Sequence, residues 1–182
     1  MSETAPARPH SPSRPSAWVR RFAPLVPAAG AVLDLAFGGG RHSRLFLAAG
    51  HPVTAVDIAV SGLADLAGQQ GLEIVEADLE DGRPFPLAGR SFAGVVVTNY
   101  LHRPLLPALV EAVASGGLLI YETFARGNER FGRPSNPDFL LAPGELLDAV
   151  RGRLRVLAYE DLLVENPRPA AVQRIAARNE AA

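Results

Sequence analysis

The sequence predicts an α/β fold in which a doubly wound, mostly parallel sheet ends in an antiparallel hairpin. Short runs rich in Val, Ile and Leu, with little polar alternation, predict strands that are buried on both faces. They cover residues 31–36, 52–57, 72–77, 92–98 and 118–123. Helical segments alternate with these runs, and such alternation is typical of a parallel sheet. Two later runs, 154–159 and 171–177, are separated only by residues 160–170. That connection is too short for a helical crossover, so the two runs should pair antiparallel.

Helix-boundary residues place the helices between the strands. The expected helices cover residues 41–49, 61–69, 104–114 and 143–150. Ser61 is a candidate N-cap, because its side chain can accept a hydrogen bond from a free backbone N–H. Pro104 and Pro143 stand near first-turn positions, where proline is favoured.

The beginning of the chain divides into a tail and the start of a domain. Residues 1–15 are rich in Pro, Ser, Ala and Arg and bury too little apolar surface to become ordered, so they are expected to form a disordered tail. Trp18, Phe22 and Leu25 then recur at helical spacing and predict a short amphipathic helix. Residues 16–182 are expected to form one domain, because a chain of 182 residues has the usual length of a single domain.

Composition removes several classes of chemistry. The chain has no Cys, and all 18 basic residues are Arg, since the sequence contains no Lys. Thiolate nucleophiles, thiolate metal sites, Schiff-base lysines and P-loop lysines are therefore excluded, and no metal site is expected. A net charge of -1 gives no overall basic field, which makes nucleic acid an unfavourable partner. Without a signal peptide or an apolar run near the roughly 20 residues of a spanning helix, the sequence predicts a cytoplasmic protein with no membrane partner.

The segment from Val32 to Gly40 is the most informative motif in the chain. An apolar strand ends on a carboxylate, Asp34, and continues through Ala36 into Gly38, Gly39 and Gly40. Glycine permits a sharp turn with positive φ and lets a ligand approach the backbone closely. The sequence therefore predicts a small-molecule binding corner at the end of the first strand.

Polar residues also end the next three strands. Asp57 ends the second strand and suits a ribose diol, Asp78 ends the third, and Asn99 and Tyr100 follow the fourth. Each residue alone is equally typical of a turn or a helix cap. Because ligands in open α/β sheets bind at the carboxyl ends of the strands, the series together predicts one ligand site.

A nicotinamide dinucleotide is the alternative ligand. Its fingerprint requires Gly-x-Gly-x-x-Gly, whereas the segment from Gly38 reads Gly-Gly-Gly-Arg-His-Ser. The third glycine, which permits close packing of helix on strand, is replaced by Ser43. Dinucleotide binding, and with it an oxidoreductase, is disfavoured.

From about residue 17 to residue 178 the chain resembles the class I S-adenosylmethionine-dependent methyltransferases. The resemblance implies a Rossmann-like sheet of strand order 3-2-1-4-5-7-6 and S-adenosylmethionine as the cofactor. It also implies that the corner holds the methionine part, Asp57 the ribose and Asp78 the adenine. The implied cofactor-binding set is Asp34, Ala36, Gly38, Gly40, Asp57, Ile58, Asp78, Leu79 and Asn99. Ala36 stands where the family has its first glycine, which implies a modest loss of affinity. The compact form also looks similar to small bacterial methyltransferases of the tellurite-resistance type.

The resemblance implies in-line methyl transfer to a small-molecule acceptor, a reaction that needs alignment more than a catalytic base. Candidate catalytic residues are Tyr100, His102 and Glu122. For Glu122, pairing with an Arg and contact with the substrate are equally favoured roles, because a carboxylate within an apolar strand must be paired or reach the ligand edge. Residues 124–142 form a long loop rich in Gly, Pro, Asn and Arg, which predicts a substrate lid. Arg126, Arg130 and Arg133 of this loop are expected to face an anionic or polar substrate, and the expected substrate-binding set is Arg103, Arg126 and Arg133. A non-catalytic binding module is the alternative function, and the sequence leaves open whether the protein is a monomer or a homodimer.

Overall fold

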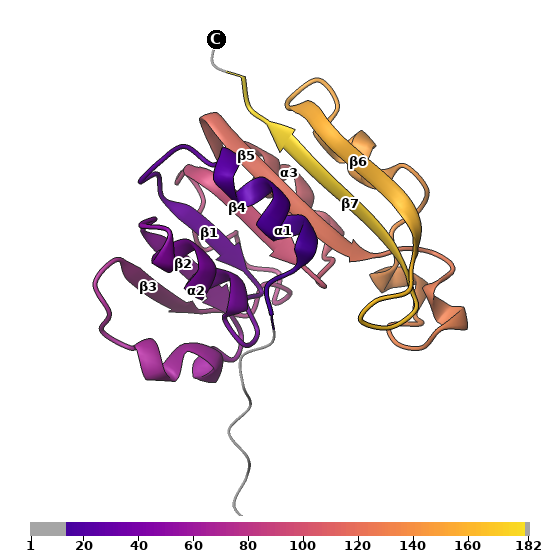
Figure 1. Cartoon of the computed structure of the whole chain (residues 1–182), viewed down its shortest axis with the longest axis horizontal. Coiled ribbons are helices and arrows are strands. Elements are labelled where there is room, and N and C mark those ends of the chain that lie inside the picture. The colour runs from indigo at the N-terminus through magenta and orange to yellow at the C-terminus, as the bar shows by residue number, and fades with distance from the viewer. Residues whose placement is uncertain (1–13, 181–182) are drawn as a thin grey trace, which may run out of the picture.

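A computed structural model describes residues 14–180 and contains one seven-stranded sheet. The strand order is β3-β2-β1-β4-β5-β7-β6, as the sequence predicts (Figure 1). The pairs among the first five strands are parallel, whereas β7 pairs antiparallel with both β5 and β6. The predicted mixed α/β fold and its closing hairpin are therefore confirmed.

The strands overlap their predicted positions, although β5 begins five residues before its predicted start and β6 ends five residues after its predicted end, and the helices are shorter. The strands are β1 Val32–Leu35, β2 Val53–Asp57, β3 Leu72–Glu76, β4 Phe92–Thr98, β5 Val113–Phe124, β6 Arg155–Val164 and β7 Ala170–Arg178. The α-helices are α1 Ala17–Phe22, α2 Arg41–Ala48, α3 Leu106–Glu111 and α4 Glu145–Val150. Short 3₁₀ helices are η1 Ala23–Leu25, η2 Val60–Leu66, η3 Arg103–Leu105, η4 Asn128–Arg130 and η5 Pro137–Phe139.

The helix predicted at residues 61–69 is wrong. A 3₁₀ helix, η2, occupies most of that range, and its N-cap is Ala59, so Ser61 does not cap it. Gly62 explains the difference, because it packs so closely on the chain after β1 that an added Cβ would lie 1.9 Å from the Gly38 carbonyl oxygen. This tertiary contact, rather than local propensity, determines the path of the segment.

Two further predictions need correction. The helix expected at 104–114 ends at Glu111, because Val113 already pairs with Phe92 as the beginning of β5. The third strand, β3, is only partly buried, although its apolar sequence predicts cover on both faces. It forms the edge of the sheet and pairs only with β2, so fewer elements cover it.

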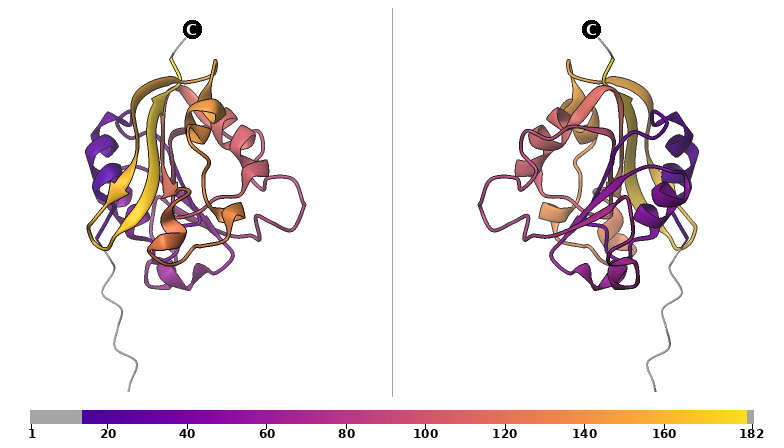
Figure 2. Two further views of the ribbon diagram at one scale, coloured as in Figure 1. Left: turned by 90° about the vertical axis from the view of Figure 1, so that its right-hand side faces the viewer. Right: turned by 90° about the vertical axis from the view of Figure 1, so that its left-hand side faces the viewer.

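Helices cover both faces of the sheet, as the two side views in Figure 2 show. Trp18 and Phe22 of α1 pack with Phe46 of α2 in a core on one face. Leu109 of α3 and Leu146 of α4 belong to the core on the other face. The carboxyl ends of β1 to β5 thus meet at one edge between the two layers, where a ligand can approach.

The predicted tail, residues 1–15, lies mostly outside the described residues, since only Arg14 and Pro15 of it are described. Within residues 14–180, no helix is long and apolar enough to cross a membrane.

Candidate functional site

The turn after β1 has the left-handed backbone that its glycines predict. Ala36, Gly38 and Gly40 have φ values of 52°, 54° and 71°. A Cβ at Gly40 would lie 2.2 Å from Leu63 Cδ2 of η2, so that position requires glycine. At Gly38 and Gly39 an added Cβ would meet nothing within 4 Å. The turn is therefore braced on one side by η2 and open on the other.

Asp57, at the end of β2, holds this turn in place. Its Oδ2 accepts a hydrogen bond from the Gly38 N–H at 2.8 Å, and its Oδ1 accepts one from the Ala59 N–H at 3.0 Å. Each carboxylate oxygen can accept a further hydrogen bond. The carboxylate is thus oriented by the backbone and can still accept hydrogen bonds from a ligand.

A cavity of about 540 Å³, here called the acidic cavity, lies over the ends of β1, β2 and β3 and beside the end of β4. Its lining residues are Ala36, Asp57, Ile58, Ala77, Asp78, Leu79, Glu80 and Tyr100. Five of the nine predicted cofactor-binding residues lie in this lining. The lining contains the carboxylates of Asp57, Asp78 and Glu80 and no arginine. Sequence reasoning missed Ala77 and Glu80, although they flank the predicted Asp78 and Leu79 in sequence.

Asp34 lies behind the turn rather than in the cavity. It is 1% exposed, and its Oδ2 accepts a hydrogen bond of 2.6 Å from the hydroxyl of Ser43 on α2. Burial raises the pKa of this carboxyl to about 6, although the hydrogen bond from Ser43 acts in the opposite direction. Asp34 thus joins the end of β1 to α2.

Tyr100 belongs to the acidic cavity and keeps its proton at neutral pH. Burial raises the pKa of its hydroxyl above the ordinary value, and the charges of Glu80, Asp78 and Asp57 raise it further. A tyrosine in this state can donate a hydrogen bond but cannot serve as a general base near neutrality.

A second cavity, of about 500 Å³, lies over the ends of β4 and β5 and the hairpin of β6 and β7. It is called the arginine cavity, because its charged lining residues are Arg14, Arg41, Arg168, Arg174 and Glu122. Asn99, a predicted cofactor-binding residue with φ of 56°, lies in its lining. Tyr100, the next residue, lines the acidic cavity. The two cavities therefore flank the end of β4.

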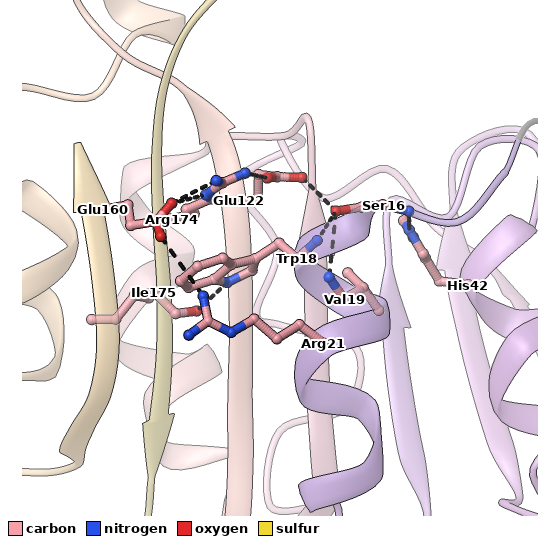
Figure 3. Close-up of polar contacts among 9 residues, drawn as sticks. All are labelled: Ser16, Trp18, Val19, Arg21, His42, Glu122, Glu160, Arg174 and Ile175. Carbon is pink, nitrogen blue, oxygen red and sulfur yellow. Dashed lines mark hydrogen bonds and ion pairs between the residues drawn. The ribbon is translucent and has the colours of Figure 1, made fainter. Parts of the chain in front are cut away.

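Glu122 pairs with an arginine, which was one of its two predicted roles. Its two oxygens contact Ser16 Oγ at 2.7 Å and Arg174 Nη1 at 3.1 Å (Figure 3). Arg174 also donates to Glu160 at 2.7 Å and lies 4.9 Å from the centre of the Trp18 ring. This network ties the beginning of α1 to β5, β6 and β7.

His42 completes the attachment of α1. Its Nε2 accepts a hydrogen bond of 3.1 Å from the Ser16 N–H, which requires that nitrogen to be unprotonated. Burial lowers the pKa of His42 to about 3, and the charge of Arg41 lowers it too, so the ring is neutral at physiological pH.

The structure does not bring the predicted loop arginines into either cavity. Arg126, Arg130 and Arg133 are exposed on the loop and line neither cavity. Arg103 instead donates to Glu145 Oε1 at 2.6 Å and to the carbonyl oxygens of Asp138 and Leu140 at 2.6 and 2.9 Å. It thus holds the loop against α4, and His102, beside it, also lies outside both cavities.

The residues that sequence reasoning missed are chiefly those of the arginine cavity. Arg41 directly follows the glycine turn, which was a usable signal. Arg168 lies in the connection between β6 and β7, and Arg174 lies within β7. Their proximity to the turn depends on the register of the hairpin against β5, for which the sequence offers no local signal.

Comparison with known proteins agrees with the fold. Residues 33–115 match a family model described as a methyltransferase domain. The crystal structure of TehB from Haemophilus influenzae has a TM-score of 0.69 and 18% identity, over 90% of this chain and 61% of TehB. The chain therefore spans less than two thirds of TehB. A search of curated proteins found no match.

Two further structures share the fold. The 1,6-didemethyltoxoflavin-N1-methyltransferase of Burkholderia thailandensis, with its namesake compound and S-adenosylhomocysteine bound, has a TM-score of 0.64 and 19% identity, over 90% of this chain and 79% of that one. The glycopeptide N-methyltransferase MtfA with S-adenosylhomocysteine has a TM-score of 0.59 and 21% identity, over 88% of each chain.

Proposed function

We propose that the chain transfers the methyl group of S-adenosylmethionine to a small-molecule acceptor, because residues 33–115 match a family model described as a methyltransferase domain. The acidic cavity would hold the adenosine part, with Asp57 accepting hydrogen bonds from the ribose hydroxyls and Asp78 near the adenine. The methionine part would extend over the open face of Gly38 and Gly39. Asp34 would act through the turn that it supports.

The observation that carries the proposal is the charge of the acidic cavity. Three carboxylates and no arginine line it. Carboxylates suit the hydroxyl donors of a ribose, and S-adenosylmethionine and NAD both carry an adenosine. The cavity therefore favours an adenosine-containing ligand, and Ser43 in place of the third glycine of the dinucleotide fingerprint favours S-adenosylmethionine over NAD.

The acceptor would enter through the arginine cavity. A non-catalytic binding module needs only a cofactor cavity, whereas an enzyme also needs space for an acceptor beside it. A cavity of about 500 Å³ that includes Asn99 supplies that space. Its presence supports the enzyme over the binding module.

In the transfer, a lone pair of the acceptor atom attacks the methyl carbon in line with the carbon–sulfur bond. That bond breaks, and the sulfur keeps its electron pair, which leaves S-adenosylhomocysteine. An acceptor atom with a free lone pair needs no general base, and any proton that it carries afterwards can leave to water. The protein's own contribution is alignment, which can supply about 7 to 11 kcal/mol of the barrier in favourable cases.

Calorimetric titration with S-adenosylmethionine, S-adenosylhomocysteine and NAD tests this function. Binding of the first two alone is expected, and Asp57→Asn should weaken it roughly tenfold or more, because charge-assisted hydrogen bonds are lost. Glu129→Gln, an exposed change on the loop, serves as the matched control. Binding of NAD alone, or of none of the three, would contradict the proposal.

A further inference from the structure

The arginine cavity carries more positive charge than its surroundings neutralise. Arg174 is neutralised by Glu122 and Glu160. Arg14, Arg41 and Arg168 form no salt bridge within residues 14–180. Three guanidinium groups without a carboxylate partner in that range therefore line one cavity.

These arginines come from three distant parts of the chain. Arg14 precedes α1, Arg41 begins α2, and Arg168 lies between β6 and β7. The Nη1 of Arg41 donates to the Arg14 carbonyl oxygen at 3.4 Å, which places these two segments side by side. Convergence of three arginines on a cavity differs from an ordinary solvated face, because their charges surround a shared volume.

We propose that the methyl acceptor of this protein is an organic molecule with a carboxylate or phosphate group, which Arg14, Arg41 and Arg168 bind in the arginine cavity. Guanidinium groups match both anions, because their N–H donors fit paired oxygens. The acceptor atom would lie towards Asn99, and the anionic group towards the hairpin. This inference rests on the proposed function for the identity of the cavity as an acceptor site.

The charges of the two cavities support this assignment. The acidic cavity would repel an anionic acceptor, whereas the arginine cavity would attract it. An anionic acceptor is therefore directed to the side of the end of β4 that the arginine cavity occupies. The anion would be held by residues other than the loop arginines, Arg126, Arg130 and Arg133.

The test uses defined probes on the full chain. Benzoate, pyrophosphate and the neutral isostere benzamide are titrated by calorimetry at low salt, with and without S-adenosylhomocysteine. We expect both anions to bind, benzamide to bind at least about fivefold more weakly than benzoate, and added salt to weaken the anions alone. Absence of anion binding, or equal binding of benzoate and benzamide, would overturn the inference.

Variants assign the effect to the cavity. The double variant Arg14→Gln with Arg168→Gln should weaken anion binding roughly tenfold or more, whereas Arg168→Lys should keep most of it. Arg20→Gln, an exposed change on α1 outside the cavity, should match the wild type. An equal loss in Arg20→Gln, or no loss in the double variant, would show that the anions bind elsewhere.

The same titrations separate this inference from the proposed function. The affinity for S-adenosylhomocysteine should be the same in the wild type and in the three variants, because none of the altered residues lines the acidic cavity. If S-adenosylhomocysteine fails to bind while the double variant still loses anion binding, the proposed function fails and the anion site stands. If it binds normally while anions do not, only the acceptor assignment fails.

Discussion

Two residues at the end of β1, Ala36 and Asp34, reduce the stability of the fold. Ala36 has a left-handed backbone, which costs about 1–2 kcal/mol for a residue with a Cβ. Asp34 is a fully buried carboxyl whose burial raises its pKa. Both lie at the turn that forms the acidic cavity, where strain and buried charge tend to concentrate.

Replacing Ala36 with glycine should stabilise the protein. The relief of left-handed strain exceeds the extra entropy that glycine adds to the unfolded chain, so the expected net gain is about 0.5–1 kcal/mol. Cofactor affinity should stay equal or improve, because Ala36 lines the acidic cavity. Urea unfolding of wild type and Ala36→Gly measures the gain. Lower stability in the variant would contradict the conclusion that the left-handed backbone at Ala36 is strained.

The pH dependence of stability should contain a contribution from Asp34. Because its folded pKa of about 6 exceeds the ordinary 3.8, the folded state binds this proton more tightly, and stability is lost as pH rises through that window. The loss is on the order of 2–3 kcal/mol. Asp34→Asn should remove it, so the difference in unfolding free energy between the two proteins should change between pH 4 and 7. If the difference in unfolding free energy between the two proteins stays constant over this pH range, Asp34 does not titrate there.

At the level of single elements, α1 is attached through its first turn. Ser16 Oγ donates to Glu122 and accepts from the N–H groups of Trp18 and Val19, while its own N–H donates to His42. The segment just before α1 also lines the arginine cavity. Attachment of α1 and the shape of that cavity are therefore coupled.

This attachment should weaken in acid. His42 has a folded pKa of about 3, below the ordinary 6.5, so the stability that it contributes is present above pH 6.5 and is lost as pH falls below it. Trp18, the single tryptophan and 2% exposed, reports the docking of α1 by its fluorescence. His42→Gln should flatten the fluorescence change between pH 7 and 5. Asp34 changes stability in the opposite direction in this pH window, but it is present in both proteins and does not affect their comparison. A fluorescence profile in His42→Gln that equals that of the wild type would therefore refute the role given to His42.

Arg103 is one of the side chains that hold the loop between β5 and α4, together with Asn128 and Gln173. Arg103 bonds two loop carbonyl groups and Glu145, and its own side chain is 37% exposed. Arg103→Gln should therefore cost about 1–2 kcal/mol, less than a fully buried pair would. Chemical unfolding measures this cost, and Arg153→Gln is the exposed control on α4's side of the molecule. Cofactor affinity should be unchanged, and a large loss of affinity would instead support the predicted lid.

Across the molecule as a whole, the sheet places two cavities of opposite charge on either side of the end of β4. A small net charge of -1 conceals this separation. The net charge therefore reports poorly on the charge of either cavity, because that charge depends on where the side chains lie.

Cofactor binding should stabilise the whole chain. A ligand that binds only the folded state adds about 2.7 kcal/mol at 100 times its dissociation constant. The thermal unfolding midpoint should rise with S-adenosylmethionine and S-adenosylhomocysteine, and Asp57→Asn should reduce the rise at the same concentrations. A comparable rise with NAD would argue against a specific preference for S-adenosylmethionine.

Local patterns in the sequence were sufficient to predict the positions of the strands, the glycine turn and most of the acidic cavity. Apolar runs form buried strands, glycines permit positive φ, and strand-end residues in a parallel sheet meet at one edge. Asp57, Asp78 and Tyr100 could therefore be assigned to one site from their places at the ends of successive strands.

The path of η2, the burial of Asp34 and the membership of the arginine cavity follow from tertiary contacts instead. Gly62 touches the turn after β1, Ser43 covers Asp34, and Arg168 reaches the cavity through the hairpin. Each of these contacts joins residues that are distant in the chain or belong to different elements. Their positions depend on packing and strand register, which a local pattern of residues does not encode.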